Sequence, residues 1–215
     1  MKGFSRFTVN GILCLLITFM LTPVSPVFAT VILDQEHWTE TPTATGGLSY
    51  GSTFGRAQTF TVGIDGFLDH IDVDLFMAAS TMRILATSGN TPMGGASGST
   101  ILATASLLSS SGNTHTYDFS NLSFEVNAGD ILAIELFGGG SSWRGEGNNA
   151  YTAGSAYYFS SSYGISSWTA QPGYDWNFST YVDDGTAPVP EPATMILLGS
   201  GLMGLTGLRR KLKKK

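Results

Sequence analysis

The clearest structural pattern in the chain lies in residues 66–77, which read GFLDHIDVDLFM. Apolar and polar residues alternate along this stretch, and a period of two is typical of a β-strand that has one buried and one solvated face. The pattern predicts that one face carries Phe67, Asp69, Ile71, Val73 and Leu75, and that the other carries His70, Asp72 and Asp74. The stretch therefore indicates an antiparallel sheet with one face against a core.

Similar short runs, rich in β-branched and aromatic residues, continue on both sides of this stretch. Together they predict strands at residues 57–63, 66–77, 81–87, 100–108, 114–120, 130–137, 155–163 and 175–182. Turn signals such as Asp65-Gly66 and Ser111-Gly112-Asn113 separate the runs, and no helical stripe is sustained among them. About eight short strands in about 155 residues predict an all-β fold, an antiparallel β-sandwich of jelly-roll-like type.

Composition and charge narrow the class of protein. The chain has 215 residues, of which 42% are hydrophobic and 13% charged, which suits one well-cored domain with short extensions. We expect this domain at residues 30–187. Residues 30–188 hold fifteen acidic residues against three arginines, Arg56, Arg83 and Arg144, and thus a net charge of −12. Such a surface repels nucleic acid and anionic lipid, so we expect no nucleic-acid partner.

Residues 1–29 have the features of a secretory signal peptide. Lys2 and Arg6 precede an apolar run at residues 11–21, and Val27-Phe28-Ala29 places small residues at the −3 and −1 positions of a cleavage site. We expect export through the secretion translocon and cleavage after Ala29, with an uncleaved membrane anchor as the alternative. The single cysteine, Cys14, would leave with the signal, so the mature protein would contain no disulfide and no thiol nucleophile.

The C-terminal segment, residues 188–215, combines a processing motif, an apolar run and a basic end. Residues 193–208 are apolar or small and would form a helix of about 24 Å, slightly short of the ~30 Å hydrocarbon core of a membrane. A basic stop follows, which consists of Arg209, Arg210, Lys211, Lys213, Lys214 and Lys215. These cations would keep the end on the cytoplasmic side. Prolines 188, 190 and 192 keep the preceding backbone extended and accessible to a protease.

This order of features resembles the PEP-CTERM sorting signal. The motif residues are Val189, Pro190, Glu191 and Pro192, followed by the apolar helix and the basic stop. The resemblance implies recognition by an exosortase, a membrane transpeptidase-like cysteine enzyme of Gram-negative bacteria that make exopolysaccharide. It further implies inner-membrane transit through the C-terminal helix and a final place at the cell surface or in the extracellular matrix. A plain single-span tail anchor would give the same topology without processing.

A looser resemblance covers the predicted sandwich. Four segments are similar to secreted choice-of-anchor domains, which precede interchangeable surface anchors. These segments are AQTFTVGIDGFLDHIDVDLF, ILATASL, FEVNAGDILAIEL and GYDWNFSTYV. These families mostly have no assigned activity. The resemblance therefore implies a secreted β-sandwich and no particular mechanism.

Catalytic and metal-binding patterns are weak. His37, His70 and His115 are each isolated from a nucleophile motif, and residues 30–188 contain no cysteine or lysine, so we expect no catalytic residue and no cofactor. Asp72 and Asp74 lie two residues apart and would form either half of a calcium site or a solvated stripe. We favour the stripe and expect no metal site.

Aromatic residues are concentrated towards the end of the predicted domain. Three of the four tryptophans and six of the eight tyrosines lie between Trp143 and Tyr181. Aromatic rings stack on the apolar faces of sugars, which makes a carbohydrate-binding module the alternative function. The candidate glycan-binding residues are Trp143, Arg144, Asn148 and Trp168, the tryptophans because their Ser/Gly-rich surroundings suggest exposure. The opposing interpretation is that the aromatic residues belong to the core.

The sequence thus predicts a non-catalytic secreted surface or extracellular-matrix protein, sorted through its C-terminal signal and associated with exopolysaccharide. A carbohydrate-binding module and a secreted hydrolase stay open as alternatives. The net charge favours a neutral or cationic glycan as the extracellular polysaccharide partner.

Overall fold

The computed structural model describes residues 30–48, 54–79, 81–94, 100–160 and 165–185. The expected signal peptide, the sorting motif and the C-terminal apolar helix lie outside these residues. Within the described ranges, no helix has the length and hydropathy needed to cross a membrane. The strands are β1 (Val31–His37), β2 (Ala44–Gly47), β3 (Phe54–Thr61), β4 (Gly66–Asp74), β5 (Thr81–Ser88), β6 (Thr91–Pro92), β7 (Ile101–Ser111), β8 (Thr114–Asp118), β9 (Glu125–Val126), β10 (Ile131–Phe137), β11 (Ser142–Glu146), β12 (Ala156–Ser160), β13 (Ile165–Ala170), β14 (Asp175–Trp176) and β15 (Phe178–Asp183). A short 3-10 helix (Ser120–Leu122) follows β8.

The strands form one large sheet and one small sheet. The large sheet has the order β1-β15-β4-β8-β7-β5-β10-β3-β12-β13, with β9 paired to β4 and β6 to β5. The small sheet has the order β14-β11-β2. Neighbouring strands in both sheets pair antiparallel, which agrees with the predicted fold class.

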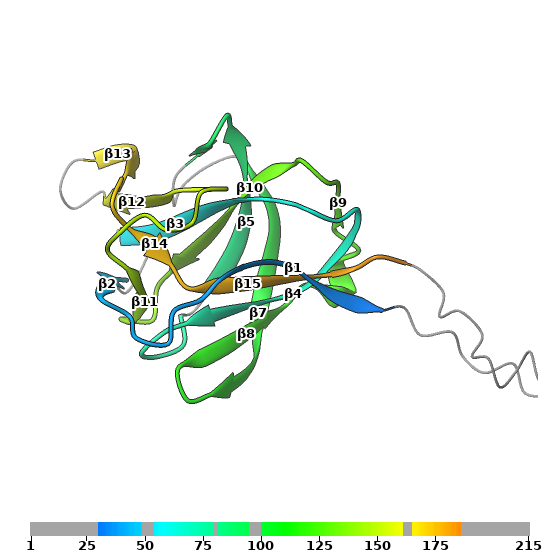
Figure 1. Cartoon of the computed structure of the whole chain (residues 1–215), viewed down its shortest axis with the longest axis horizontal. Coiled ribbons are helices and arrows are strands. Elements are labelled where there is room, and N and C mark those ends of the chain that lie inside the picture. Colours follow the sequence, from blue (N-terminus) through cyan, green and yellow to red (C-terminus); the bar gives the residue numbers. More distant parts are fainter. Residues whose placement is uncertain (1–29, 49–53, 80, 95–99, 161–164, 186–215) are drawn as a thin grey trace, which may run out of the picture. The chain divides into compact units, whose positions relative to one another are not determined.

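Strand β7 pairs with strands of both layers of the sandwich and so connects the two layers. Its first half, at Ile101–Ala105, pairs with β5, and its second half, from Ser106, pairs with β8. The register shifts in both pairings, and such irregularities bend a strand and increase its twist. The sheet therefore curls over on itself, and Figure 1 shows the strands wrapping around a common interior. This architecture confirms the predicted antiparallel β-sandwich, with two layers that are continuous through β7.

The main core lies between the two layers. The rings of Phe60 in β3 and Phe178 in β15 meet across it, with centroids 5.9 Å apart. The interior is completed by buried apolar side chains of both layers, among them Ile71, Val73, Met82, Ile84, Tyr117, Ile134 and Leu136. Burial of one such side chain contributes about 1.5–3 kcal/mol, so this interior is the main source of stability.

The predicted faces of residues 66–77 are correct in the second half of β4 and wrong in the first half. Leu68 is buried and Phe67 is 44% exposed, the reverse of the prediction. The cause is a β-bulge at Asp69: adjacent residues of β15 pair with His70 and Leu68, and Asp69 is left as the extra residue. The bulge shifts the alternation by one. After it, the predicted inward residues Ile71, Val73 and Leu75 are all buried.

Candidate functional site

Trp143, the first glycan candidate, is a core residue. It lies in β11, its side chain is fully buried, and its ring stacks on Trp176 with centroids 6.2 Å apart. The indole N–H donates a hydrogen bond of 2.8 Å to the carbonyl of Asn177, and a β-bridge to Leu75 ties β11 to the large sheet. The prediction that Trp143 is exposed is therefore wrong, because the small sheet packs its tryptophans onto the main core. A ring buried on all sides cannot stack on a sugar.

Trp168, the second aromatic candidate, is also buried. Only 8% of the residue is exposed, and it packs against Phe159 with ring centroids 6.0 Å apart. It belongs to a second apolar cluster, separate from the main core, that contains Ala57, Leu85, Ala133, Tyr157, Phe159 and Trp168. The prediction of exposure is wrong here too, because β13 continues the sheet and turns its tryptophan towards this cluster.

Arg144 forms a structural ion pair. Its Nη1 lies 3.1 Å from Oδ1 of Asp74, and the Asn177 side chain donates to the other carboxylate oxygen at 3.1 Å. Asp74 is only 4% exposed, so the predicted solvated stripe is wrong at this residue. Burial raises the pKa of Asp74, and Arg144 and Asn177 oppose this shift. Arg144 therefore compensates a buried carboxylate and is committed to the fold.

The remaining polar candidates do not converge on one site. Asn148 is exposed in the loop after β11. Asp72 accepts a hydrogen bond of 2.6 Å from the Thr116 hydroxyl, whereas Asp74 faces Arg144. Among the described residues, no group of three or more His, Cys, Asp and Glu is arranged to hold a metal ion. Trp143 and Trp168 lie in different clusters, so the four glycan candidates do not form one binding surface.

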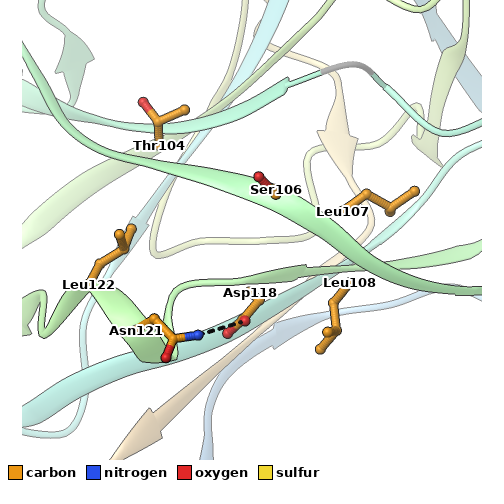
Figure 2. Close-up of a pocket in the computed structure, with 7 residues that line it drawn as sticks. All are labelled: Thr104, Ser106, Leu107, Leu108, Asp118, Asn121 and Leu122. Atoms are coloured by element: carbon orange, nitrogen blue, oxygen red, sulfur yellow. Dashed lines mark hydrogen bonds between the residues drawn. The ribbon is translucent and has the colours of Figure 1, made fainter.

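A shallow cavity of about 270 Å³ lies beside β7 and the end of β8. It is lined by Thr104, Ser106, Leu107, Leu108, Asp118, Asn121 and Leu122, and Figure 2 shows these side chains around it. The Asp118 carboxylate accepts hydrogen bonds from Ser120 and Asn121, which hold its pKa below the ordinary value. The carboxylate is thus engaged in its own turn, and none of the sequence-predicted candidates lines the cavity.

Two of the described histidines make polar side-chain contacts. His70 Nδ1 lies 2.5 Å from the Asp69 carboxylate, and its ring stacks on Tyr181 with centroids 4.1 Å apart. The Ser110 hydroxyl lies 2.8 Å from Nδ1 of His115, because the two residues pair across β7 and β8. Sequence analysis missed this serine–histidine pair, since the register shift in β7 precedes it. Neither Ser110 nor His115 lines the cavity.

A second arginine also compensates a buried carboxylate. Glu135 in β10 is fully buried, and its carboxylate lies 3.6 Å from Nη1 of Arg83 in β5. Burial raises the pKa of Glu135, and the neighbouring Arg83 opposes the shift. Two of the three arginines of the domain thus face buried acids.

The third arginine, Arg56 in β3, lies among aromatic rings. Its Cζ is 4.8 Å from the ring centroid of Phe54, 5.6 Å from that of Tyr158 and 5.5 Å from that of Trp176. Tyr174 stacks on Trp176, with centroids 5.8 Å apart and an interplanar angle of 24°. We define the Arg56 cluster as Phe54, Arg56, Tyr158, Gln171, Tyr174 and Trp176.

Polar contacts fix the orientation of the Arg56 side chain. Its Nε donates to the Gly47 carbonyl at 3.3 Å, and its Nη1 donates to Oε1 of Gln171. Burial lowers the pKa of Arg56 to about 10, which leaves the guanidinium charged at neutral pH. Sequence analysis missed this cluster, because its residues come from β3, β12, β14 and the turn between β13 and β14.

Comparison with known proteins identifies the C-terminal segment. Residues 188–211 match the family model described as the PEP-CTERM protein-sorting motif. The match contains the motif residues Val189, Pro190, Glu191 and Pro192 and the first residues of the basic stop, all of which lie outside the described residues. The chain thus carries the sorting motif of PEP-CTERM proteins, as the resemblance implied, and is an extracellular protein sorted by an exosortase. No curated protein matches the chain.

Proposed function

We propose that the protein is a non-catalytic component of the cell surface or extracellular matrix that associates with exopolysaccharide. The observation that carries the proposal is the PEP-CTERM motif at residues 188–211, which follows an all-β domain in the same chain. Sorting by an exosortase delivers the domain outside the cell. An acidic domain of this kind is suited to an extracellular scaffold, because its net charge keeps it soluble and away from anionic lipid.

The route to the surface has three steps. The secretion translocon exports the chain and removes residues 1–29. The apolar residues 193–208 then stop in the inner membrane of the Gram-negative cell, with the basic stop on the cytoplasmic side. The exosortase finally acts on the extended backbone near Val189–Pro192, which frees the domain from its membrane segment.

The contacts of the acidic side chains support a non-catalytic role. Asp74 and Glu135 face arginines. The Asp175 carboxylate accepts hydrogen bonds from the Tyr151 backbone at 2.8 Å and from the Gln58 side chain at 3.4 Å. A general acid or base needs a free oxygen directed at a substrate, whereas these carboxylates connect strands and loops of the fold.

A secreted hydrolase is the second candidate, and the Ser110–His115 contact is the observation that favours it. A serine nucleophile needs an adjacent base, and the base needs a third group that orients it. Asp74 is the carboxylate whose pKa the nearby His115 lowers, but it is committed to Arg144 and Asn177, which weakens the case for such a triad. If the candidate is correct, Ser110→Ala abolishes esterase and glycosidase turnover by the purified protein; we expect no turnover in either form.

Cell fractionation tests the proposed function. We expect the wild-type chain in the exopolysaccharide fraction and a Pro190→Ala/Glu191→Ala variant in the membrane fraction, because the exosortase no longer recognises its motif. Glu125→Ala is the matched control, since Glu125 is an exposed glutamate that lies outside the motif and outside the glycan candidates; it should fractionate like the wild type. Wild-type protein that stays with the membrane, or that leaves the cell without binding the polymer, would contradict the proposal.

A further inference from the structure

Arg56 differs from the other two arginines of the domain because it has no carboxylate partner among the residues that the structure describes. Apart from Glu191, every Asp and Glu of the chain lies in the described residues. The ion pairs that arginines form among these residues involve Arg83 and Arg144, and none of them involves Arg56. The neighbours that raise its pKa by their charge are Tyr158 and Tyr174. The cluster therefore holds a cation whose charge is not neutralised by the fold.

The Arg56 guanidinium also keeps hydrogen-bonding capacity. It has five N–H donors, and the contacts with described residues use the Nε–H and one N–H of Nη1. The residue is partly exposed, and these contacts leave three of its N–H groups over. A planar guanidinium with two free N–H groups is suited to bidentate recognition of a carboxylate.

Close packing holds the cluster rigidly. A Cβ at Gly46 would lie 2.7 Å from Cη2 of Trp176 and 2.9 Å from Nε of Arg56, so a glycine is required where β2 passes the cluster. Trp176 is almost completely buried and forms the base on which Arg56 and Tyr174 lie. Because these groups are held in place before any ligand arrives, binding costs little conformational entropy.

Tyr174 supplies an apolar surface beside the cation. One face of its ring lies against Trp176, and the residue is 41% exposed. Pyranose rings stack their C–H faces on such aromatic surfaces. The combination of a fixed ring and an unpaired guanidinium is thus complementary to a sugar that has an apolar face and a negatively charged substituent.

We infer that the Arg56 cluster binds an acidic sugar, a pyranose with a carboxylate as in uronic-acid polymers, which stacks on Tyr174 and pairs with Arg56. The inference deepens the proposed function, because it takes the extracellular polysaccharide as the source of this sugar. The overall negative charge of the domain opposes a polyanion at long range. Salt screens that repulsion beyond about 8 Å at physiological ionic strength, whereas the contact with Arg56 persists.

Calorimetric titration of the full chain in mild detergent tests the inference, with oligogalacturonate as the acidic probe and a cello-oligosaccharide of equal length as the neutral probe. We expect tighter binding of the acidic probe. Arg56→Gln should weaken it about tenfold or more, since two charge-assisted hydrogen bonds are lost. Tyr174→Ala should weaken it about fivefold through lost stacking. Phe67→Ala is the control, because Phe67 is similarly exposed, at 44%, and pairs with β9, a strand that Figure 1 shows on the opposite side of the domain from β13 and β14.

Several outcomes would overturn the inference. These are equal affinity for both probes, no binding of either, or unchanged affinity in a folded Tyr174→Ala variant. If Arg56→Gln does not fold, Arg56→Lys keeps the charge without the planar fork, and it should still weaken binding. Retention of the wild-type chain on the native exopolysaccharide separates the two proposals. Retention without binding of oligogalacturonate refutes the acidic-sugar site alone, whereas loss of retention refutes the proposed association with the polymer.

Discussion

Replacing Arg144 by methionine should destabilise the domain through Asp74. The substitution keeps the length and apolar stem of the side chain, so that its packing near Phe76, whose ring lies 5.3 Å from the guanidinium carbon, changes little. What it removes is the cation 3.1 Å from a carboxylate that is 4% exposed. The Asp74 charge would then be left with the hydrogen bond from Asn177 and the smaller effect of the nearby His115 as its compensation.

The magnitude follows from the cost of leaving a buried charge unpaired, which is about 3–5 kcal/mol. Because Asn177 still donates to Asp74 and the Arg144 side chain is 18% exposed, we expect the lower end, about 3 kcal/mol of unfolding free energy at neutral pH. For a domain of this size, such a loss lowers the melting temperature by about 6–12 °C. Asp74→Asn combined with Arg144→Met should recover part of the loss, because the double variant buries no unpaired charge.

The loss of stability in the Arg144→Met variant should also depend on pH. Burial already raises the pKa of Asp74 in the folded state, so folding becomes more favourable as the pH falls through that raised pKa. Without Arg144, which lowers the pKa, the carboxyl would take up its proton at a still higher pH. The difference between variant and wild type should therefore be largest at neutral pH and shrink as the pH falls through the raised pKa of Asp74. Thermal unfolding followed by circular dichroism measures this difference in unfolding free energy. A loss of stability below about 1 kcal/mol at neutral pH, or a loss that does not change with pH, would refute the reasoning.

Three further predictions concern the core, metals and export. Trp143→Ala should cost about 3–5 kcal/mol of stability in chemical denaturation, because it opens a cavity beneath the small sheet and removes the shorter of the two hydrogen bonds to the Asn177 carbonyl; a loss of less than 1 kcal/mol would place the ring at the surface. Adding a chelator should leave the melting temperature unchanged, since Asp72 and Asp74 are engaged by Thr116 and Arg144; a large drop would identify them as metal ligands. N-terminal sequencing of the exported protein should begin at Thr30, and an intact Met1 would contradict cleavage after Ala29.

The sheet architecture was predictable because alternation along a strand is a local property. Ile71 and Val73 are buried as the pattern of residues 66–77 indicates. The bulge at Asp69 was not predictable, because it depends on how β15 pairs with β4. The PEP-CTERM motif was predictable for the same reason as the strands, since its residues are contiguous.

The buried tryptophans show where composition misleads. The glycine-rich surroundings of Trp143 suggested an exposed loop. In the structure, a Cβ at Gly145 would lie 2.0 Å from the Asp175 carbonyl oxygen, so this glycine allows two strands to approach closely above a buried ring. The Arg56 cluster had no local signal, because Arg56 meets Tyr158 only through the pairing of β3 with β12 and meets Trp176 only where the small sheet approaches β3.

The most direct test of exosortase sorting is the intact mass of the protein recovered from the exopolysaccharide fraction. We predict a chain that begins at Thr30 and ends near Val189–Pro192 in wild-type cells, and a chain that keeps its C-terminal segment in cells without the exosortase. A surface protein that still contains Arg209–Lys215 in wild-type cells would contradict processing at the motif and would identify residues 188–215 as a permanent membrane anchor.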